Sequence, residues 1–136
     1  MFIHKANVRV RYADTDQMGF VYNGKYFEYF EVARTELLRD YGMTYKSIEE
    51  SGYMLPVLEV KIAYKSPAFY DELLEIETTV EEAPQTRISL KHKIFVPERQ
   101  KLICEGTLQL VFVDAVRKRP VKAPQFFVDA FKKFYE

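Results

Sequence analysis

The sequence contains no tryptophan, a single cysteine, and no apolar stretch long enough to cross a bilayer. A membrane-spanning helix needs about 20 consecutive apolar residues, so no transmembrane segment is predicted. The lone Cys104 cannot form an internal disulfide, which favours a reducing compartment. Polar and charged residues follow Met1-Phe2-Ile3-His4-Lys5, where a secretory signal would be hydrophobic. We therefore expect a cytoplasmic protein.

An excess of charge of one sign is also lacking. The 20 Lys and Arg residues balance the 20 Asp and Glu residues, so the formal net charge is zero with histidine neutral. Without a broad positive field, nucleic acid is not an expected partner, and an anionic ligand needs a local cationic patch. No Ser-, Gly- or Pro-rich linker and no repeat divides the chain, so one domain is expected over residues 1–136.

The longest helical pattern runs from Asn23 to Tyr41. Apolar side chains recur there at helical spacing, whereas charged side chains occupy other directions. The apolar positions are Tyr22, Tyr26, Phe30, Ala33, Leu37 and Tyr41. We predict a helix of about 28 Å, with Asn23 as its N-cap and Gly42 as its C-terminal stop.

Alternating apolar and polar residues predict five strands around this helix. The first covers Asn7 to Ala13, with Val8, Val10 and Tyr12 on one face. The apolar faces of the other four are Leu58, Val60, Ile62 and Tyr64; Leu74, Ile76, Thr78 and Val80; Ile88, Leu90, His92 and Ile94; and Leu102, Cys104, Leu108, Leu110 and Phe112. A last helix is expected within 124–135. Because each strand has one solvent-exposed face, we expect an α+β fold with a curved antiparallel five-stranded sheet wrapped around the long helix.

The segment 11–22 joins the first strand directly to the start of the long helix, and it carries Asp14 and Asp16. The free N–H groups at a helix start can hold an anion or stabilise the oxyanion that forms when a thioester is attacked. Asp16 could attack the acyl carbon itself or take a proton from water. The alternative is that both aspartates only cap and close a turn.

The same segment opens a long motif. Tyr12-Ala13-Asp14-Thr15-Asp16 is followed by Gly19-Phe20-Val21-Tyr22, Tyr26, Phe30-Glu31, Ala33-Arg34 and Leu38, and later by Ile62-Ala63-Tyr64, Pro67-Ala68 and Tyr70-Asp71-Glu72-Leu73. With these residues the sequence resembles the 4-hydroxybenzoyl-CoA thioesterase family, particularly its bacterial acyl-CoA thioesterase branch, over nearly the whole chain. The resemblance implies a hotdog fold and hydrolysis of an acyl-CoA thioester.

The resemblance also implies individual roles. Asp16, the second aspartate of the motif, is the expected catalytic residue, Asp14 is structural, and Tyr12 is an active-site tyrosine. The backbone N–H of Asn23 is expected to polarise the thioester carbonyl. Where the branch commonly reads His-x-Asn-Tyr, this chain has Asn23-Gly24-Lys25-Tyr26. Carbonyl polarisation by a backbone N–H survives this change, but proton transfer by an imidazole does not.

The substrate-binding residues are predicted from their place in the motif and from their charge. Gly19, Tyr22 and Tyr26 of the motif are expected to line the substrate site. Coenzyme A carries phosphates, for which the sequence offers the cationic residues Lys65, Arg87, Lys118 and Arg119 near strand ends. Lys118 and Arg119 belong to the run Arg117-Lys118-Arg119 before Pro120, and the ordinary meaning of such a basic run is a solvated loop.

The remaining reactive side chains support no other chemistry. His4 and His92 have no metal-binding neighbours at recognisable spacing, Cys104 has no base partner, and no Gly-x-Ser-x-Gly elbow is present. No metal or cofactor is expected, and coenzyme A would be part of the substrate. The resemblance implies a homodimer or homotetramer with each site between two protomers. An acyl-ACP thioesterase acting on an acyl carrier protein, and a noncatalytic acyl-thioester-binding module, remain the alternatives.

Overall fold

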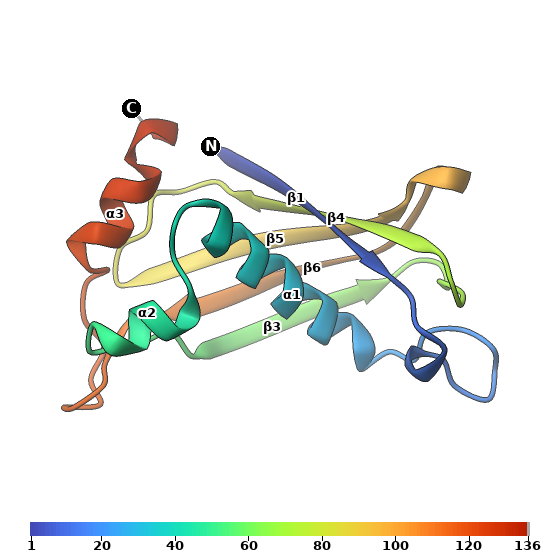
Figure 1. Ribbon diagram of the computed structural model, residues 1–136, viewed down its shortest axis with the longest axis horizontal. Coiled ribbons are helices and arrows are strands. Elements are labelled where there is room, and N and C mark those ends of the chain that lie inside the picture. Colours follow the sequence, from blue (N-terminus) through green and yellow to red (C-terminus); the bar gives the residue numbers. More distant parts are fainter. Residues whose placement is uncertain (136) are drawn as a thin grey trace.

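The computed structural model describes residues 1–135, and its main element is a five-stranded sheet (Figure 1). The strands are β1 (Phe2–Arg9), β3 (Val57–Tyr64), β4 (Leu73–Val80), β5 (Arg87–Val96) and β6 (Lys101–Val111). They lie in the order β1-β4-β5-β6-β3, and every neighbouring pair is antiparallel. The predicted α+β class with a five-stranded antiparallel sheet is therefore confirmed.

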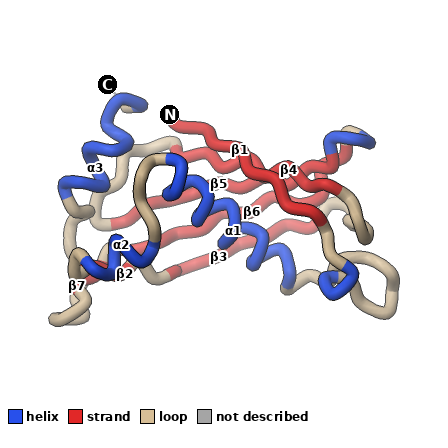
Figure 2. The backbone as a smooth tube through the Cα atoms, viewed as in Figure 1, coloured by secondary structure: helices blue, strands red, loops and turns tan. Residues whose placement is uncertain are grey.

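Helix α1 (Lys25–Asp40) lies across the sheet (Figures 1 and 2). Its 16 residues are fewer than the 19 positions from Asn23 to Tyr41 that the periodicity indicated. The N-cap is Gly24, already in helical conformation, and no side chain among residues 1–135 caps this end, so the prediction of Asn23 as N-cap is wrong. The chain leaves the helix at Gly42 with φ 79°, a left-handed conformation that suits glycine.

Several short elements complete the fold. They are η1 (Tyr12–Asp14), α2 (Tyr45–Glu50), β2 (Tyr53–Met54), η2 (Pro97–Arg99), β7 (Val113–Asp114), α3 (Gln125–Phe131) and η3 (Lys132–Phe134). The terminal helix was expected, whereas α2 and the small β2-β7 pair were not. Helix α2 is marked in the sequence by Thr44 and Ser47, whose side chains accept each other's backbone N–H in a capping box.

The first strand differs from its prediction at both ends. It begins at Phe2 because its whole length pairs with β4, from Phe2 opposite Val80 to Arg9 opposite Leu73. It stops before Tyr12, which lies in the turn η1 with 76% of its surface exposed. Tyr12 therefore does not continue the buried face of Val8 and Val10, and its ring is free to meet other residues at this end of the molecule.

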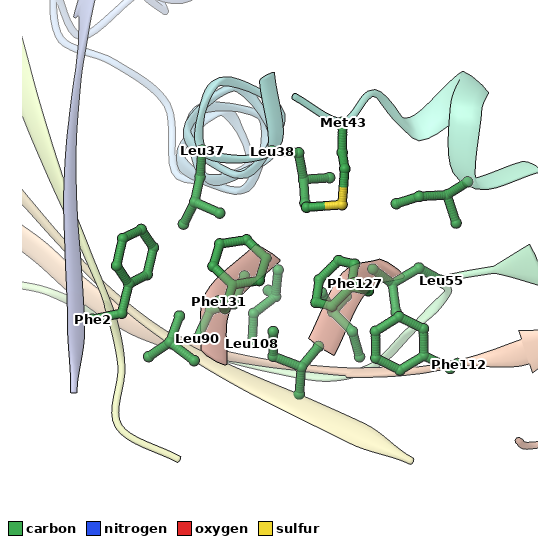
Figure 3. Close-up of a cluster of buried hydrophobic side chains, with 14 residues drawn as sticks. Phe2, Leu37, Leu38, Met43, Leu55, Leu90, Leu108, Phe112, Phe127 and Phe131 are labelled. Carbon is green, nitrogen blue, oxygen red and sulfur yellow. The ribbon is translucent and has the colours of Figure 1, made fainter. Parts of the chain in front are cut away.

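The core lies between α1, α3 and the inner face of the sheet. Figure 3 shows one cluster, in which Leu37 and Leu38 of α1 face Leu90 and Leu108 of the sheet, with Phe127 close by. A second cluster lies nearer the start of α1, and its members are Ala6, Val10, Val21, Tyr26, Tyr29, Phe30, Ala33, Ala68, Leu74, Ile76, Ile94, Val96, Ile103 and Cys104. Two members of this second cluster, Val10 and Val21, flank the loop that carries Asp16.

The edge strand β3 leaves apolar side chains uncovered. Val60 lies opposite the buried Leu108 and Tyr64 opposite the buried Cys104, so both belong to the inner face. Even so, Leu58, Val60 and Tyr64 are all exposed in the single chain, because α1 covers the middle of the sheet rather than this edge. Among residues 1–135, no helix is long and apolar enough to span a membrane.

Candidate active site

The loop that leads into α1 is anchored by a buried carboxylate. Asp14 is 0% exposed, and its Oδ2 accepts the Arg11 backbone N–H at 3.0 Å and the Tyr29 hydroxyl at 2.8 Å. Its Oδ1 lies 3.1 Å from the Arg11 guanidinium and 3.3 Å from Lys25 Nζ. Burial raises the pKa of Asp14, but these donors together outweigh burial and hold the pKa below its ordinary value. The ionised carboxylate thus ties the loop to α1.

Asp16 has a different environment two residues later. It is exposed, and among the described residues its Oδ1 accepts only the Met18 N–H, at 2.9 Å. An isolated bridge between Thr15 and Val21, together with the bond from Asp16 N to Phe20 O at 3.0 Å, closes the loop behind it. Gly19 makes the reversal with φ 86°, which glycine adopts without strain. The carboxylate is therefore fixed in place and open to a ligand.

The start of α1 presents two unpaired donors. The first helical bonds run from Lys25 N to Tyr22 O at 3.0 Å and from Tyr26 N to Asn23 O at 3.3 Å. Within residues 1–135, the backbone N–H groups of Asn23 and Gly24 have no acceptor. The bridge pairs Thr15 with Val21 and folds the loop back on itself. Asn23 and Gly24 come two and three residues after Val21 in the chain. Such donors can bind the oxygen of a polarised carbonyl.

A cavity of about 260 Å³ opens beside this helix start. Its lining residues are Phe20, Val21, Asn23, Tyr26, Tyr64, Lys65, Ser66 and Pro67. The structure therefore brings Asn23, Tyr26 and Lys65 of the predicted site residues together, with Gly19 and Tyr22 in the adjoining loop. Burial raises the pKa of Tyr26 to about 12, so its hydroxyl stays protonated at neutral pH.

The loop between β3 and β4 forms the other wall. Val21 N–H donates to Ala68 O at 2.9 Å, which joins this loop to the Asp16 loop. The ring of Tyr70 meets the predicted site residue Tyr12 edge-on, with centroids 5.6 Å apart. Glu72 accepts two bonds from Arg99, at 2.7 and 2.9 Å, which hold the wall from the far side. Tyr12 therefore contacts the loop between β3 and β4, and its role in the site stays a prediction.

Three predicted phosphate contacts lie elsewhere. Arg87 begins β5 opposite Val111, and Lys118 and Arg119 follow β7, so all three are at the end of the sheet that carries α2 (Figure 1). The Asp16 loop is at the other end, beyond the start of α1. The structure does not bring these three side chains to Asp16 within one chain, and their role in substrate binding stays a prediction.

The other reactive side chains, His92 and Cys104, are buried in the core. His92 stacks on Phe30 with ring centroids 4.6 Å apart, and burial lowers its pKa to about 3. The prediction that His92 and Cys104 face the core is confirmed. Partly exposed Lys25 and buried Tyr29 were missed as partners of Asp14, because their helical positions carried no separate signal. In residues 1–135 no three His, Cys, Asp or Glu side chains gather as metal ligands would.

Comparison with known proteins gives concordant results. Residues 10–131 match the thioesterase-like superfamily. The chain is 34% identical over 125 residues to the acyl-CoA thioesterase YbgC of Haemophilus influenzae, covering 91% of this chain and 90% of that one. It is 32% identical over 126 residues to the acyl-CoA thioester hydrolase YbgC of Escherichia coli O6:H1, covering 93% of each. The solved DHNA-CoA thioesterase of Staphylococcus aureus superposes with a TM-score of 0.89 at 31% identity, over 98% of this chain and 91% of that one.

Proposed function

The chain belongs to the thioesterase-like superfamily and hydrolyses acyl-CoA thioesters, and we propose that Asp16 is its catalytic carboxylate. The observation that carries this proposal is an exposed carboxylate in the loop that leads to free helix-start donors. Asp16 has one backbone partner, and the N–H groups of Asn23 and Gly24 have none within residues 1–135. Coenzyme A is part of the substrate, and α1 takes the place of the central helix of a hotdog fold.

In the general-base route, the Asp16 carboxylate takes a proton from water as the water oxygen attacks the thioester carbon. The carbonyl oxygen becomes an oxyanion, which the N–H groups at the start of α1 stabilise. Collapse of the tetrahedral intermediate breaks the carbon–sulfur bond, and the departing sulfur takes the proton from Asp16. The products are the free acid and coenzyme A.

In the nucleophilic route, an Asp16 oxygen attacks the thioester carbon and expels the coenzyme A thiolate, leaving an acyl–aspartyl anhydride that water hydrolyses. The same helix-start donors serve this route. A single turnover in ¹⁸O-labelled water with enzyme in excess detects this route when water attacks the aspartyl carbon of the anhydride. Label incorporated into the Asp16 side chain establishes the anhydride, whereas base catalysis places the label only in the product acid.

A hydrolysis panel tests the assignment. Acyl-CoA thioesters of increasing chain length, aromatic acyl-CoA thioesters, and an acyl carrier protein loaded with the same acyl groups are offered to the purified protein. We expect turnover of at least one acyl-CoA. Turnover of the carrier-bound thioesters alone would move the substrate class to acyl-ACP, and binding without any turnover would favour the noncatalytic module.

We further propose a homo-oligomer, because the inner face of the edge strand β3 is apolar and uncovered. Light scattering at micromolar concentration should give at least a dimer mass. Val60→Lys, which places a charge on this face, should lower the mass, whereas Lys61→Ala on the opposite face of the same strand should not. A monomeric parent with full turnover would contradict a site shared between protomers.

Hydrolysis is expected to need no added metal, since Asp16 and the helix-start donors supply attack and carbonyl polarisation. Treatment with a chelator followed by desalting should leave turnover unchanged. Loss of activity that one divalent ion restores would instead assign Asp14 and Asp16 to a metal.

A further inference from the structure

One carbonyl at the start of α1 receives a second hydrogen bond from outside the helix. Asn23 O accepts the Tyr26 N–H at 3.3 Å and also the Tyr64 hydroxyl at 3.2 Å. The peptide bond between Asn23 and Gly24 is trans, so its C=O and N–H lie in one plane and point in opposite directions. A partner that holds the Asn23 oxygen therefore also fixes the direction of the Gly24 N–H.

Tyr64 is well placed to hold this oxygen. It is the last residue of β3, paired with the buried Cys104 of β6, so a strand rather than a mobile loop carries it. Its ring lies against the Tyr26 ring with centroids 5.7 Å apart, and Tyr26 is only 2% exposed. Tyr64 itself is 46% exposed and lines the cavity at the helix start. Its hydroxyl thus reaches the helix from the sheet.

We propose that Tyr64 is a positioning residue for thioester hydrolysis, acting through the Asn23–Gly24 peptide. A hydrogen bond to the carbonyl polarises the peptide and strengthens its N–H as a donor. It also adds to the Tyr26 N–H in restraining this peptide, which no capping side chain in the described part of the chain holds, while negative charge develops on the substrate oxygen. The inference rests on the proposed function, because the Gly24 N–H matters only if the helix start binds that oxygen.

Two other roles for Tyr64 make different predictions. If the ring only packs against Tyr26, removal of the hydroxyl changes nothing in turnover. If Tyr64 acts through subunit contact at the exposed edge of β3, a change in the hydroxyl alters the mass of the oligomer. A positioning role predicts a fall in kcat with unchanged mass and unchanged folding.

The test is Tyr64→Phe, which removes the hydroxyl and keeps the ring. Loss of one hydrogen bond of this kind should lower kcat by about 3- to 10-fold, with KM within about twofold of the parent because ground-state binding is unaffected. The melting temperature and the mass by light scattering should match the parent. Tyr53→Phe is the matched control, since Tyr53 lies on β2 at the far end of the molecule (Figure 2) and its hydroxyl has no hydrogen-bond partner within residues 1–135.

Several outcomes overturn the inference. An unchanged kcat, an equal fall in Tyr53→Phe, a rise in KM alone, or a change of mass would each remove Tyr64 from carbonyl positioning. Asp16→Asn is assayed beside it, so the two claims fail separately. If Asp16→Asn loses turnover and Tyr64→Phe keeps it, only the positioning role fails. If the parent hydrolyses no acyl thioester, the proposed function fails and takes this role with it.

Discussion

Replacement of Asp16 by asparagine is expected to lower thioester turnover by about 100- to 10,000-fold while the protein stays folded. The substitution keeps the size of the side chain and an oxygen that can accept the Met18 N–H. In the parent protein, Met18 N lies 2.9 Å from Asp16 Oδ1. The substitution removes the negative charge on which both nucleophilic attack and proton abstraction depend. The measurement is turnover of an acyl-CoA that the parent hydrolyses, beside thermal unfolding.

The matched control is Asp129→Asn, which makes the same chemical change at an exposed position on α3. It should leave turnover and melting temperature unchanged. If Asp16→Asn retains more than about a tenth of parental turnover, Asp16 is not the catalytic carboxylate and a binding module gains support. If turnover and melting temperature fall together, Asp16 serves to close the loop instead.

The largest effect on stability is expected from Asp14→Asn. An asparagine at this buried position loses the charge that pairs with Arg11 and Lys25. Its NH2 group would also face hydrogen-bond donors that contact a carboxylate oxygen in the parent protein. We expect the free energy of unfolding to fall by about 3 kcal/mol, the lower end of the loss that follows removal of one partner of a buried ion pair, because the partner Arg11 is itself exposed. Turnover should fall much less than in Asp16→Asn, because Asp14 Oδ1 and Oδ2 are occupied by the protein.

The stability effect of Asp14 should depend on pH in a defined direction. Its pKa in the folded protein is lowered, so its contribution is complete above the ordinary aspartate pKa of about 3.9 and is lost as the pH falls through the folded value. Chemical unfolding of parent and variant should therefore show the full difference at about pH 7 and a smaller one at about pH 3. A difference that grows on acidification would contradict the network around Asp14.

The sequence predicted the sheet and the position of the main helix because their apolar residues follow the periods of strand and helix. The prediction failed where the burial of a side chain depends on which other element packs against it. The first strand was expected to begin at Asn7, yet it begins at Phe2 because residues 2–6 also pair with β4, and His4 is buried there with its Nε2 2.7 Å from Asp40. Val60 and Tyr64 carry the apolar alternation of a core strand, yet they lie at an uncovered edge.

For the candidate site, too, features within one chain segment could be predicted, whereas contacts between distant segments could not. Asp16 and Asn23 could be assigned to one loop from the sequence alone because they are seven residues apart in the chain, so this part of the prediction needs no knowledge of the sheet. The position of Arg87 and Lys118 relative to that loop depends on the strand register and on the end of the sheet at which each residue lies. A linear sequence contains neither. The contact from Tyr64 to the helix start was missed for the same reason, since it joins elements 41 residues apart.

The buried cysteine bears on how all these variants can be assayed. Cys104 is 0% exposed, and burial raises the pKa of its thiol to about 12, whereas disulfide reagents react with accessible thiolates. A chromogenic thiol reagent added during turnover should therefore read the released coenzyme A with no background from folded enzyme. In denaturant the same reagent finds one thiol per chain, so a single colour reaction reports both catalytic rate and the fraction of molecules unfolded.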